Sequence, residues 1–234
     1  MIFRQLFDRV SCTYTYLIAD RRGGEACLID PVLGQVDRYL KTLAELGLRL
    51  VKAIDTHLHA DHITGAGTLR ARTLCHTVMG EQSAAEVVSL RVRDSDRIAV
   101  GSLALRAIHT PGHTEDSYCF LLDGRVFTGD TLHIRGTGRT DFQNGNAAVQ
   151  YESLFNRLLR LPEETLVYPG HDYKGDTVST IGEERAFNPR LQVGSADEYV
   201  ALMHGLGLPR PSMMDVAIPA NLCLGLLPAG APET

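Results

Sequence analysis

Short apolar runs separated by turns predict that the chain opens with strands. Runs at residues 14–19 and 25–30 flank the turn 20–24, and this arrangement predicts a β-hairpin. Apolar residues then recur at helical spacing over 36–46, and Gly47 should end the helix that they form.

The alternation of strands and helices continues toward the C-terminus. Further strands are expected at residues 50–55, 73–78, 97–109 (two strands), 118–122, 126–129 and 165–168. Further helices are expected up to about residue 72 and at 147–160, 178–188 and 196–204, before a Pro-rich tail. This order predicts an α/β fold, an αββα sandwich of two mixed β-sheets with helices on both outer faces. We expect one domain over 1–234, with 188–234 as a short C-terminal extension packed on it.

Length and composition are those of an ordinary globular protein. The chain has 234 residues, of which 44% are hydrophobic and 22% charged, enough to bury a sizeable core. A net charge of -5 and the lack of a long apolar run predict neither nucleic-acid nor membrane binding. No secretory signal pattern opens the chain, so we expect a cytoplasmic protein, or a mitochondrial-matrix protein stripped of its targeting segment. The five scattered cysteines predict free thiols.

One segment, Thr56-His57-Leu58-His59-Ala60-Asp61-His62, holds the densest chemistry in the chain. It places three imidazoles and a carboxylate between a buried strand and a helix. These groups are common ligands of zinc, iron and manganese. Residues two apart share a face in an extended segment, so His57 and His59 can point the same way. A surface loop could hold one histidine by chance, but this density predicts a metal site.

Further metal-binding residue types follow later strands. In chain order, the candidates are His57, His59, Asp61, His62, His113, Asp130 and His171. Taken singly, His113 could be a turn residue and Asp130 an ordinary helix cap. Taken with the histidine-rich segment, both are better explained as ligands. Spacing alone does not select the ligands from these seven residues.

The segments THLHADH, TPGHT, FTGD and YPGHD follow one another over residues 56–172 and resemble the signature of the metallo-β-lactamase superfamily. The resemblance implies the same αββα sandwich that the element order predicts. The superfamily supports several chemistries, so the fold does not settle the function. Four histidines match none of its ligand positions and are expected to be structural: His76, His109, His133 and His204.

Two groups of the superfamily compete as explanations. A resemblance to the persulfide dioxygenases, which are non-haem iron enzymes, covers residues 127–143, 171–175, 183–191 and 218–221. It implies oxidation of glutathione persulfide by dioxygen and water to sulfite and glutathione, in sulfide catabolism. The alternative is a dinuclear zinc thioester hydrolase resembling glyoxalase II, in which two metals share all seven ligands. That group binds glutathione through basic residues near its C-terminus, whereas Lys174 is the only lysine after His171 here. A non-enzymatic binding module has little support, because every ligand type is retained.

The dioxygenase resemblance implies one Fe(II) per chain, bound by His57, His113 and Asp130. Two imidazoles and a carboxylate on one face of ferrous iron leave positions open for a persulfide sulfur and dioxygen. His171 is then expected to be catalytic and to deliver a proton to the departing thiolate. Three further residues are expected to orient the ligands from outside the coordination sphere: His59, Asp61 and His62.

Substrate contacts are expected from the charges of glutathione, which carries two carboxylates. Arginine binds carboxylates through two parallel N–H bonds, so Arg139 and Arg185 are the best candidates. Asp141 is expected to pair with Arg139 or to bind the substrate ammonium, and Tyr173 to contact substrate or to hydrogen-bond near the iron. The alternative is that these groups only hold the loop 131–146 in place. The resemblance also implies a homodimer.

Overall fold

The computed structural model describes residues 1–226, which form twelve strands and six α-helices. The strands of one sheet are β1 (Ile2–Asp8), β2 (Thr13–Ala19), β3 (Glu25–Ile29), β4 (Arg49–Ile54), β5 (His76–Gly80) and β6 (Leu90–Val92). Those of the other are β7 (Arg97–Val100), β8 (Leu103–His109), β9 (Tyr118–Leu122), β10 (Arg125–Gly129), β11 (Leu166–Pro169) and β12 (Ser179–Thr180). The helices are α1 (Val36–Leu46), α2 (Ala66–Thr73), α3 (Ala147–Phe155), α4 (Ile181–Phe187), α5 (Ala196–His204) and α6 (Met214–Leu222).

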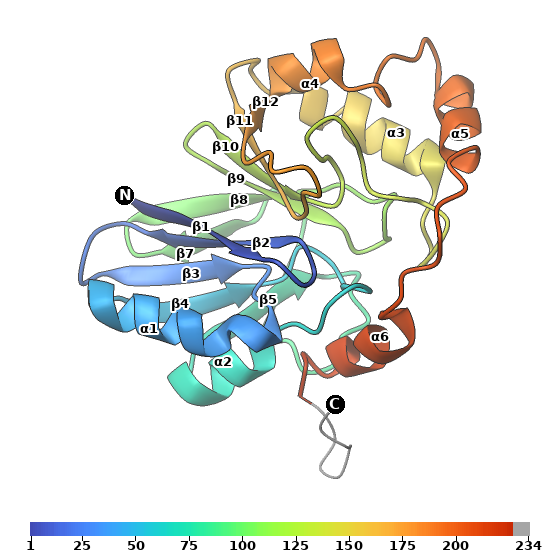
Figure 1. Ribbon diagram of the computed structural model, residues 1–234. Coiled ribbons are helices and arrows are strands. Elements are labelled where there is room, and N and C mark those ends of the chain that lie inside the picture. The colour runs from blue at the N-terminus through green and yellow to red at the C-terminus, as the bar shows by residue number, and fades with distance from the viewer. Residues whose placement is uncertain (227–234) are drawn as a thin grey trace.

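The two sheets face each other and helices cover their outer sides (Figure 1). The strand order is β1-β2-β3-β4-β5-β6 in one sheet and β12-β11-β10-β9-β8-β7 in the other. Each sheet contains both parallel and antiparallel pairs. The predicted αββα sandwich of mixed sheets is therefore confirmed. Residues 227–234, the end of the expected C-terminal extension, lie outside the described residues.

The alternation of side chains along buried strands explains the layers. In β2, Tyr16 and Ile18 face the core between the sheets, whereas Leu17 faces α1 and α2. On the outer side of the other sheet, Val126 of β10 packs in one cluster with Tyr199 of α5. Because both sides of each sheet are covered, the central strands are apolar almost throughout.

Several predicted boundaries are wrong. Helix α2 reaches Thr73, and the next strand begins only at His76, because Leu74 adopts a left-handed conformation (φ 61°) that ends the helix. The helix expected over 147–160 ends at Phe155, and a separate 3-10 turn follows at Leu158–Arg160.

The C-terminal part also departs from the prediction. The segment expected at 178–188 divides into the short strand β12 and the helix α4. The Pro-rich tail contains α6, which includes Pro219. Proline disfavours helix interiors, so the sequence pattern predicted no helix there. Among the described helices, none has the length and apolar character needed to span a membrane.

One edge of the sandwich collects the ends of several strands. Strands β8, β10 and β11 run in the same direction, so their carboxyl ends meet at this edge. The carboxyl end of β4, in the other sheet, lies at the same edge. A hydrogen bond of 2.8 Å from the Tyr118 amide to the Thr56 carbonyl joins the two sheets there. Every candidate metal ligand follows one of these four strands.

Candidate metal centre

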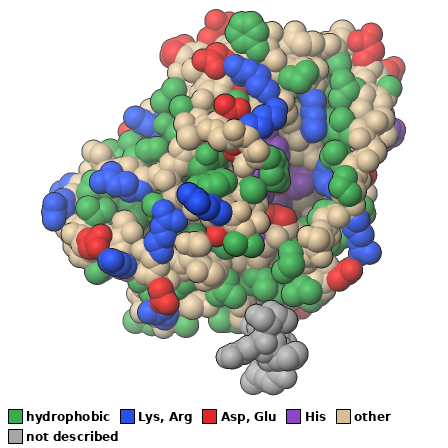
Figure 2. All heavy atoms as spheres, in the orientation of Figure 1, with side chains coloured by type: hydrophobic (Ala, Val, Ile, Leu, Met, Phe, Trp, Pro, Cys, Tyr) green, Lys and Arg blue, Asp and Glu red, His purple; other side chains and the backbone are tan. Residues whose placement is uncertain are grey.

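A cavity of about 1210 Å³ opens at the edge where these strands end. Histidine side chains are visible inside a hollow on this face of the molecule (Figure 2). Five of the seven candidate ligands line the cavity: Asp61, His62, His113, Asp130 and His171. The remaining two, His57 and His59, are buried beside it.

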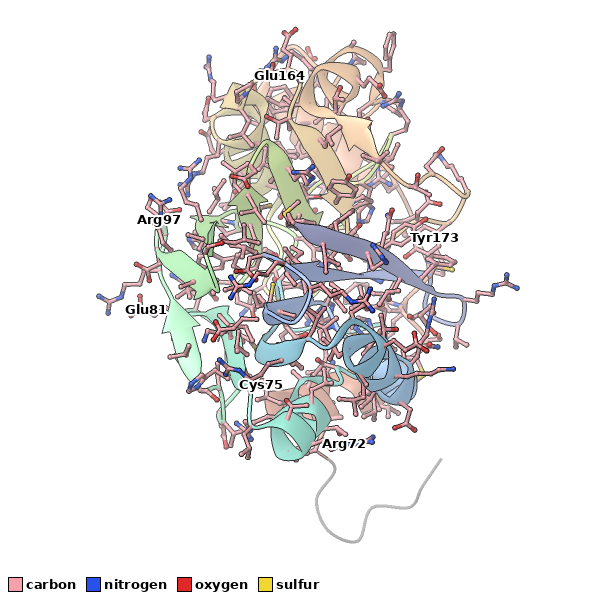
Figure 3. All side chains as sticks on the ribbon, turned by 90° about the vertical axis from the view of Figure 1, so that its left-hand side faces the viewer. Arg72, Cys75, Glu81, Arg97, Glu164 and Tyr173 are labelled. Carbon is pink, nitrogen blue, oxygen red and sulfur yellow. The ribbon has the colours of Figure 1, made fainter. Side chains whose placement is uncertain are left out.

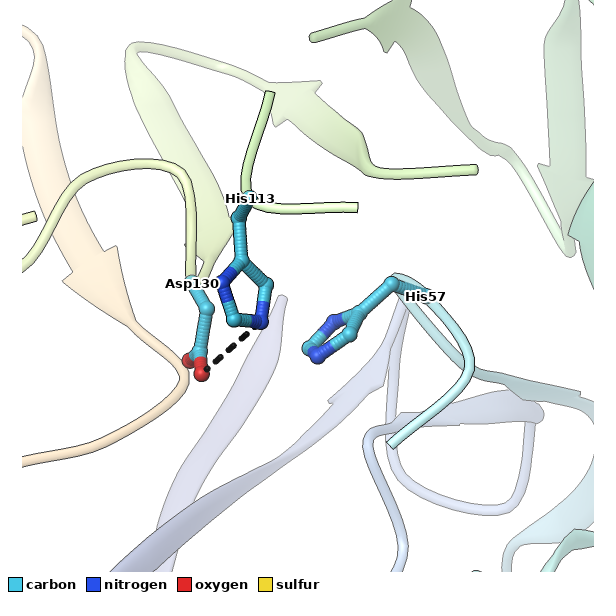
Figure 4. Close-up of side chains that lie close together, drawn as sticks. All are labelled: His57, His113 and Asp130. Carbon is cyan, nitrogen blue, oxygen red and sulfur yellow. Dashed lines mark ion pairs between the residues drawn. The ribbon is translucent and has the colours of Figure 1, made fainter. Parts of the chain in front are cut away.

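The structure brings His57, His113 and Asp130 together (Figure 4). One ligand-type atom from each lies within 4.8 Å of those of the other two. The Nε2 of His113 is 3.6 Å from Oδ2 of Asp130, and the rings of His57 and His113 have their centroids 4.8 Å apart. Three loops that are distant in sequence thus converge on one point.

Hydrogen bonds fix which nitrogen of each imidazole is free. The Thr56 hydroxyl donates to Asp30 at 3.0 Å, so its oxygen accepts from Nδ1 of His57 at 3.0 Å. The Nδ1 of His113 donates to the Arg139 carbonyl oxygen at 2.7 Å. Both imidazoles therefore keep Nε2 available, which is the usual arrangement of metal-binding histidines.

The charge state of these groups also suits a metal. Burial, together with the neighbouring His59, lowers the pKa of His57 well below its ordinary value, so this imidazole is neutral. Burial alone would raise the pKa of Asp130, but His171 and His133 hold it well below its ordinary value. Two neutral imidazoles and one carboxylate are the donor set of mononuclear non-haem Fe(II) sites, so the residues present fit such an ion.

Gly129 allows the two sheets to meet at the centre. Its φ of +48° is in the left-handed region, and a Cβ there would lie 2.5 Å from Oγ1 of Thr56. Any side chain at this position would push apart the segments that carry His57 and Asp130.

The second oxygen of Asp130 belongs to a chain of polar contacts. Its Oδ1 lies 2.7 Å from Nδ1 of His171 and 3.1 Å from Nε2 of His133. His171 reaches Oδ2 of Asp61 through Nε2, also at 2.7 Å. Burial alone would lower the pKa of His171, but the carboxylates of Asp130 and Asp61 raise it well above its ordinary value. Sequence reasoning treated His133 as structural, yet its side chain touches a candidate ligand.

His59 lies behind the three-residue centre. Its Nε2 is 3.2 Å from Asp30 and 3.8 Å from Asp55. Burial alone would lower its pKa, but these carboxylates raise it to about 9, while burial raises the pKa of Asp55 to about 7. Within the described residues, Nδ1 of His59 and Nε2 of His62 are buried without a hydrogen-bond partner. With Asp61 they form a second group that could hold a metal.

Comparison with known proteins identifies the family. Residues 10–171 match the model of the metallo-beta-lactamase superfamily. The chain is 48% identical over 229 residues to human "Persulfide dioxygenase ETHE1, mitochondrial", covering 97% of this chain and 89% of that protein. It belongs to the persulfide dioxygenase family. The expected family is thus confirmed, and the chain is an enzyme of the oxidoreductase class.

Two further relatives differ in how similar they are to this chain. The crystal structure of ETHE1 from Myxococcus xanthus is 55% identical, with a TM-score of 0.94 over 96% of this chain and 100% of that chain. A hydroxyacylglutathione hydrolase from Rhodopseudomonas palustris is more distant, at 34% identity over 94% of this chain and 86% of that protein.

Arg139, an expected substrate residue, lines the cavity, but its guanidinium is already hydrogen-bonded to other groups of the protein. Its guanidinium pairs with both oxygens of Asp141 at 2.7 and 2.8 Å and lies 4.5 Å from the ring centroid of Phe142. It also donates to the carbonyls of Leu208 and Pro209. These bonds use four of the five N–H groups of the guanidinium.

The other expected substrate residues lie in different places. Tyr173 lines the cavity, is 71% exposed and stacks parallel to His171 with 6.1 Å between centroids. Arg185 does not reach the cavity, because α4 directs it to Glu163 and to the Leu159 carbonyl. Figure 3 shows Glu164, the neighbour of Glu163, at the top of the molecule, whereas Tyr173 lies at the side of the molecule.

Arg190 is a cavity residue that sequence reasoning missed. It donates to the Thr137 carbonyl and, at 3.2 Å, to the Thr137 hydroxyl. Unlike Arg139, it forms no ion pair with a carboxylate of residues 1–226. The sequence carried no local signal of this difference: Arg185 directly follows two glutamates, but its side chain pairs with the distant Glu163.

Proposed function

We propose that this enzyme oxidises glutathione persulfide at a single Fe(II) bound by His57, His113 and Asp130. In the proposed reaction the persulfide, dioxygen and water give glutathione, sulfite and two protons. The observation that carries the proposal is the cluster of two neutral imidazoles and one carboxylate, in a chain that belongs to the persulfide dioxygenase family. A ferrous ion held by these residues would supply binding positions for dioxygen and a sulfur ligand.

His171 is the group that we assign to proton delivery. It lies between Asp130 and Asp61, whose carboxylates raise its pKa and favour a proton on the imidazole. The departing glutathione thiolate needs such a proton. Asp61 and His62 hold this arrangement, since Asp61 also accepts from Nδ1 of His62 at 3.0 Å, and His59 packs on His62 with 4.3 Å between ring centroids.

For a carboxylate of glutathione we propose Arg190 in place of Arg185. Arg190 lines the cavity without an acidic partner among the described residues, so its charge is available to an anion. Tyr173 is exposed above His171 and is proposed to contact substrate. Arg139 and Asp141 shape the rim between the metal centre and the segment 208–209.

A second candidate function has one specific observation in its favour. The unpartnered nitrogens of His59 and His62 are suited to a second ion, as the dinuclear zinc thioester hydrolase would require. The opposing observation is that both lone pairs of one Asp130 oxygen already accept hydrogen bonds, so this oxygen has none left for a second ion. We therefore place the mononuclear dioxygenase first.

Metal analysis of purified protein, combined with two assays, tests the proposal. One iron per chain with oxygen uptake that depends on glutathione persulfide is the expected result. Two zinc ions per chain with thioester cleavage, and no oxygen uptake, would select the hydrolase instead.

We propose that residues 1–234 act as one domain, working in the cytoplasm of a bacterium or in the mitochondrial matrix; the human relative is named as mitochondrial.

A further inference from the structure

We propose that His133 is a positioning residue that restricts Asp130 to a one-oxygen contact with a single metal. It acts together with His171, because the two imidazoles bind the same carboxylate oxygen. The inference rests on the metal centre of the proposed function and concerns how that centre is limited to one ion.

The contacts of Asp130 carry the argument. Its Oδ1 lies 3.1 Å from Nε2 of His133 and 2.7 Å from Nδ1 of His171. A carboxylate oxygen has two lone-pair positions, and here each faces an imidazole nitrogen. The other oxygen, Oδ2, lies 3.6 Å from Nε2 of His113 and is the one that faces the metal ligands. Oδ1 is therefore unavailable for binding the same ion through both oxygens or for bridging to a second ion.

A tight turn holds His133 in place. Its backbone pairs with Gly136, and Arg135 between them has a φ of 56°. The fully buried Glu184 accepts from the Arg135 amide at 2.8 Å and pairs with its guanidinium. The Asn188 side chain donates to the Gly136 carbonyl at 2.9 Å. Helix α4 and the residue after it therefore anchor the turn that presents His133 to Asp130.

The surroundings show why the contact matters. Within reach of the same oxygen lie the groups of a second metal site, since His171 joins Asp130 to Asp61 and Asp61 contacts His62. Without His133, one lone pair of Oδ1 would be free toward the cavity. The carboxylate could then turn or bind through both oxygens, and binding through both would raise the number of oxygen atoms on the metal.

Co(II) binding tests this inference, because its visible spectrum reports coordination number independently of turnover. Three proteins are compared with wild type: His133→Leu, which removes the N–H donor; His133→Gln, which keeps one; and His76→Leu, an exposed control. We expect His133→Leu to weaken Co(II) affinity about 10- to 100-fold, the usual effect of losing an outer contact to a ligand. Its molar absorption should also fall, because absorption decreases as coordination number rises. His133→Gln and His76→Leu should match wild type.

Circular dichroism and thermal melting establish that each variant is folded. If His133→Leu does not fold, His133→Asn replaces it, because its amide is too short to reach Asp130 whereas that of His133→Gln is not. A wild-type spectrum and affinity in the leucine or asparagine variant would overturn the inference. Wild-type protein that binds no Co(II), or two equivalents, would instead count against the mononuclear centre itself.

Discussion

The Nδ1 of His113 donates a 2.7 Å hydrogen bond to the main-chain carbonyl of Arg139. A proposed metal-binding imidazole and the rim of the cavity are thereby joined by one direct contact. The guanidinium of Arg139 is itself held by Asp141 and by the carbonyls of 208–209. Changes at the cavity rim are therefore expected to reach the metal centre.

Replacing His113 with Ala should abolish metal binding and oxygen uptake together. The proposed centre has three protein ligands, and two would bind a ferrous ion far more weakly. Metal content by elemental analysis and oxygen consumption with glutathione persulfide provide the measurements. His76→Ala, at an exposed position, is the control and should keep both. A His113→Ala protein with full iron and full activity would refute the ligand assignment.

Truncation of Arg190 should weaken substrate binding without loss of metal. A charge-assisted bond to carboxylate contributes about 1.5 to 3 kcal/mol, so KM for glutathione persulfide should rise about 10- to 100-fold in Arg190→Ala. Steady-state kinetics and metal content check this result. Arg185→Ala is the matched control, because its side chain pairs with Glu163 outside the cavity, and its KM should be unchanged. If only Arg185→Ala raised KM, the assignment suggested by the sequence would be restored.

Arg139→Ala should behave differently from Arg190→Ala. Four of its N–H groups are bonded within the protein, so its loss should lower the melting temperature and weaken metal binding through His113. Asp141→Ala removes the partner carboxylate and should produce the same two effects in smaller measure. A raised KM with unchanged melting temperature and metal affinity would show instead that Arg139 contacts substrate directly.

Asn221 should support the metal-binding loop from α6. Its side chain accepts from the Thr64 amide at 2.9 Å and donates to the carbonyls of His59 and His62 at 2.9 and 2.8 Å. Asn221→Ala leaves these buried groups unpaired, which should destabilise the protein by about 1 to 3 kcal/mol. Metal affinity should also fall about 10-fold or more.

Urea unfolding and metal titration test the role of Asn221, with the exposed Asn156→Ala as control. Asn221→Asp separates the contributions, because it keeps the acceptor for Thr64 but loses both donors. Unchanged stability and metal affinity in Asn221→Ala would show that α6 does not support the loop.

Asp94, in the turn between β6 and β7, provides a test of pH dependence through its contact with the end of β8. Burial alone would raise its pKa, but the His109 amide and the Arg157 guanidinium, at 2.9 and 2.7 Å, lower it below the ordinary 3.8. A carboxyl with a lowered folded-state pKa stabilises the protein above its unfolded-state pKa, and this stabilisation disappears as pH falls through the folded-state value.

Asp94→Asn should therefore lower stability at pH 7 by about 0.5 to 1 kcal/mol, a small effect because solvent screens this partly exposed pair. The difference from wild type in urea unfolding should shrink as pH falls toward and below 3.8. Glu164→Gln, an exposed control, should show no such difference. A gap that widens on acidification would contradict the expected sign.

The sequence by itself determined the sandwich fold and the set of candidate ligands. Strand and helix periodicity depend on neighbours a few residues away, so runs such as 14–19 and 36–46 could be assigned with small errors at their ends. The segment 56–62 concentrated the metal-binding groups within one loop, where composition alone exposes them.

Only the tertiary structure decided which side chains meet. Arg185 and Arg190 lie five positions apart, yet one pairs with Glu163 outside the cavity and the other lines it. His133 approaches Asp130 because α4 anchors its turn, and α6 forms despite Pro219, with Asn221 bonded to the metal-binding loop. These contacts join residues far apart in the chain. They depend on the directions in which packed elements present their side chains, which local periodicity does not encode.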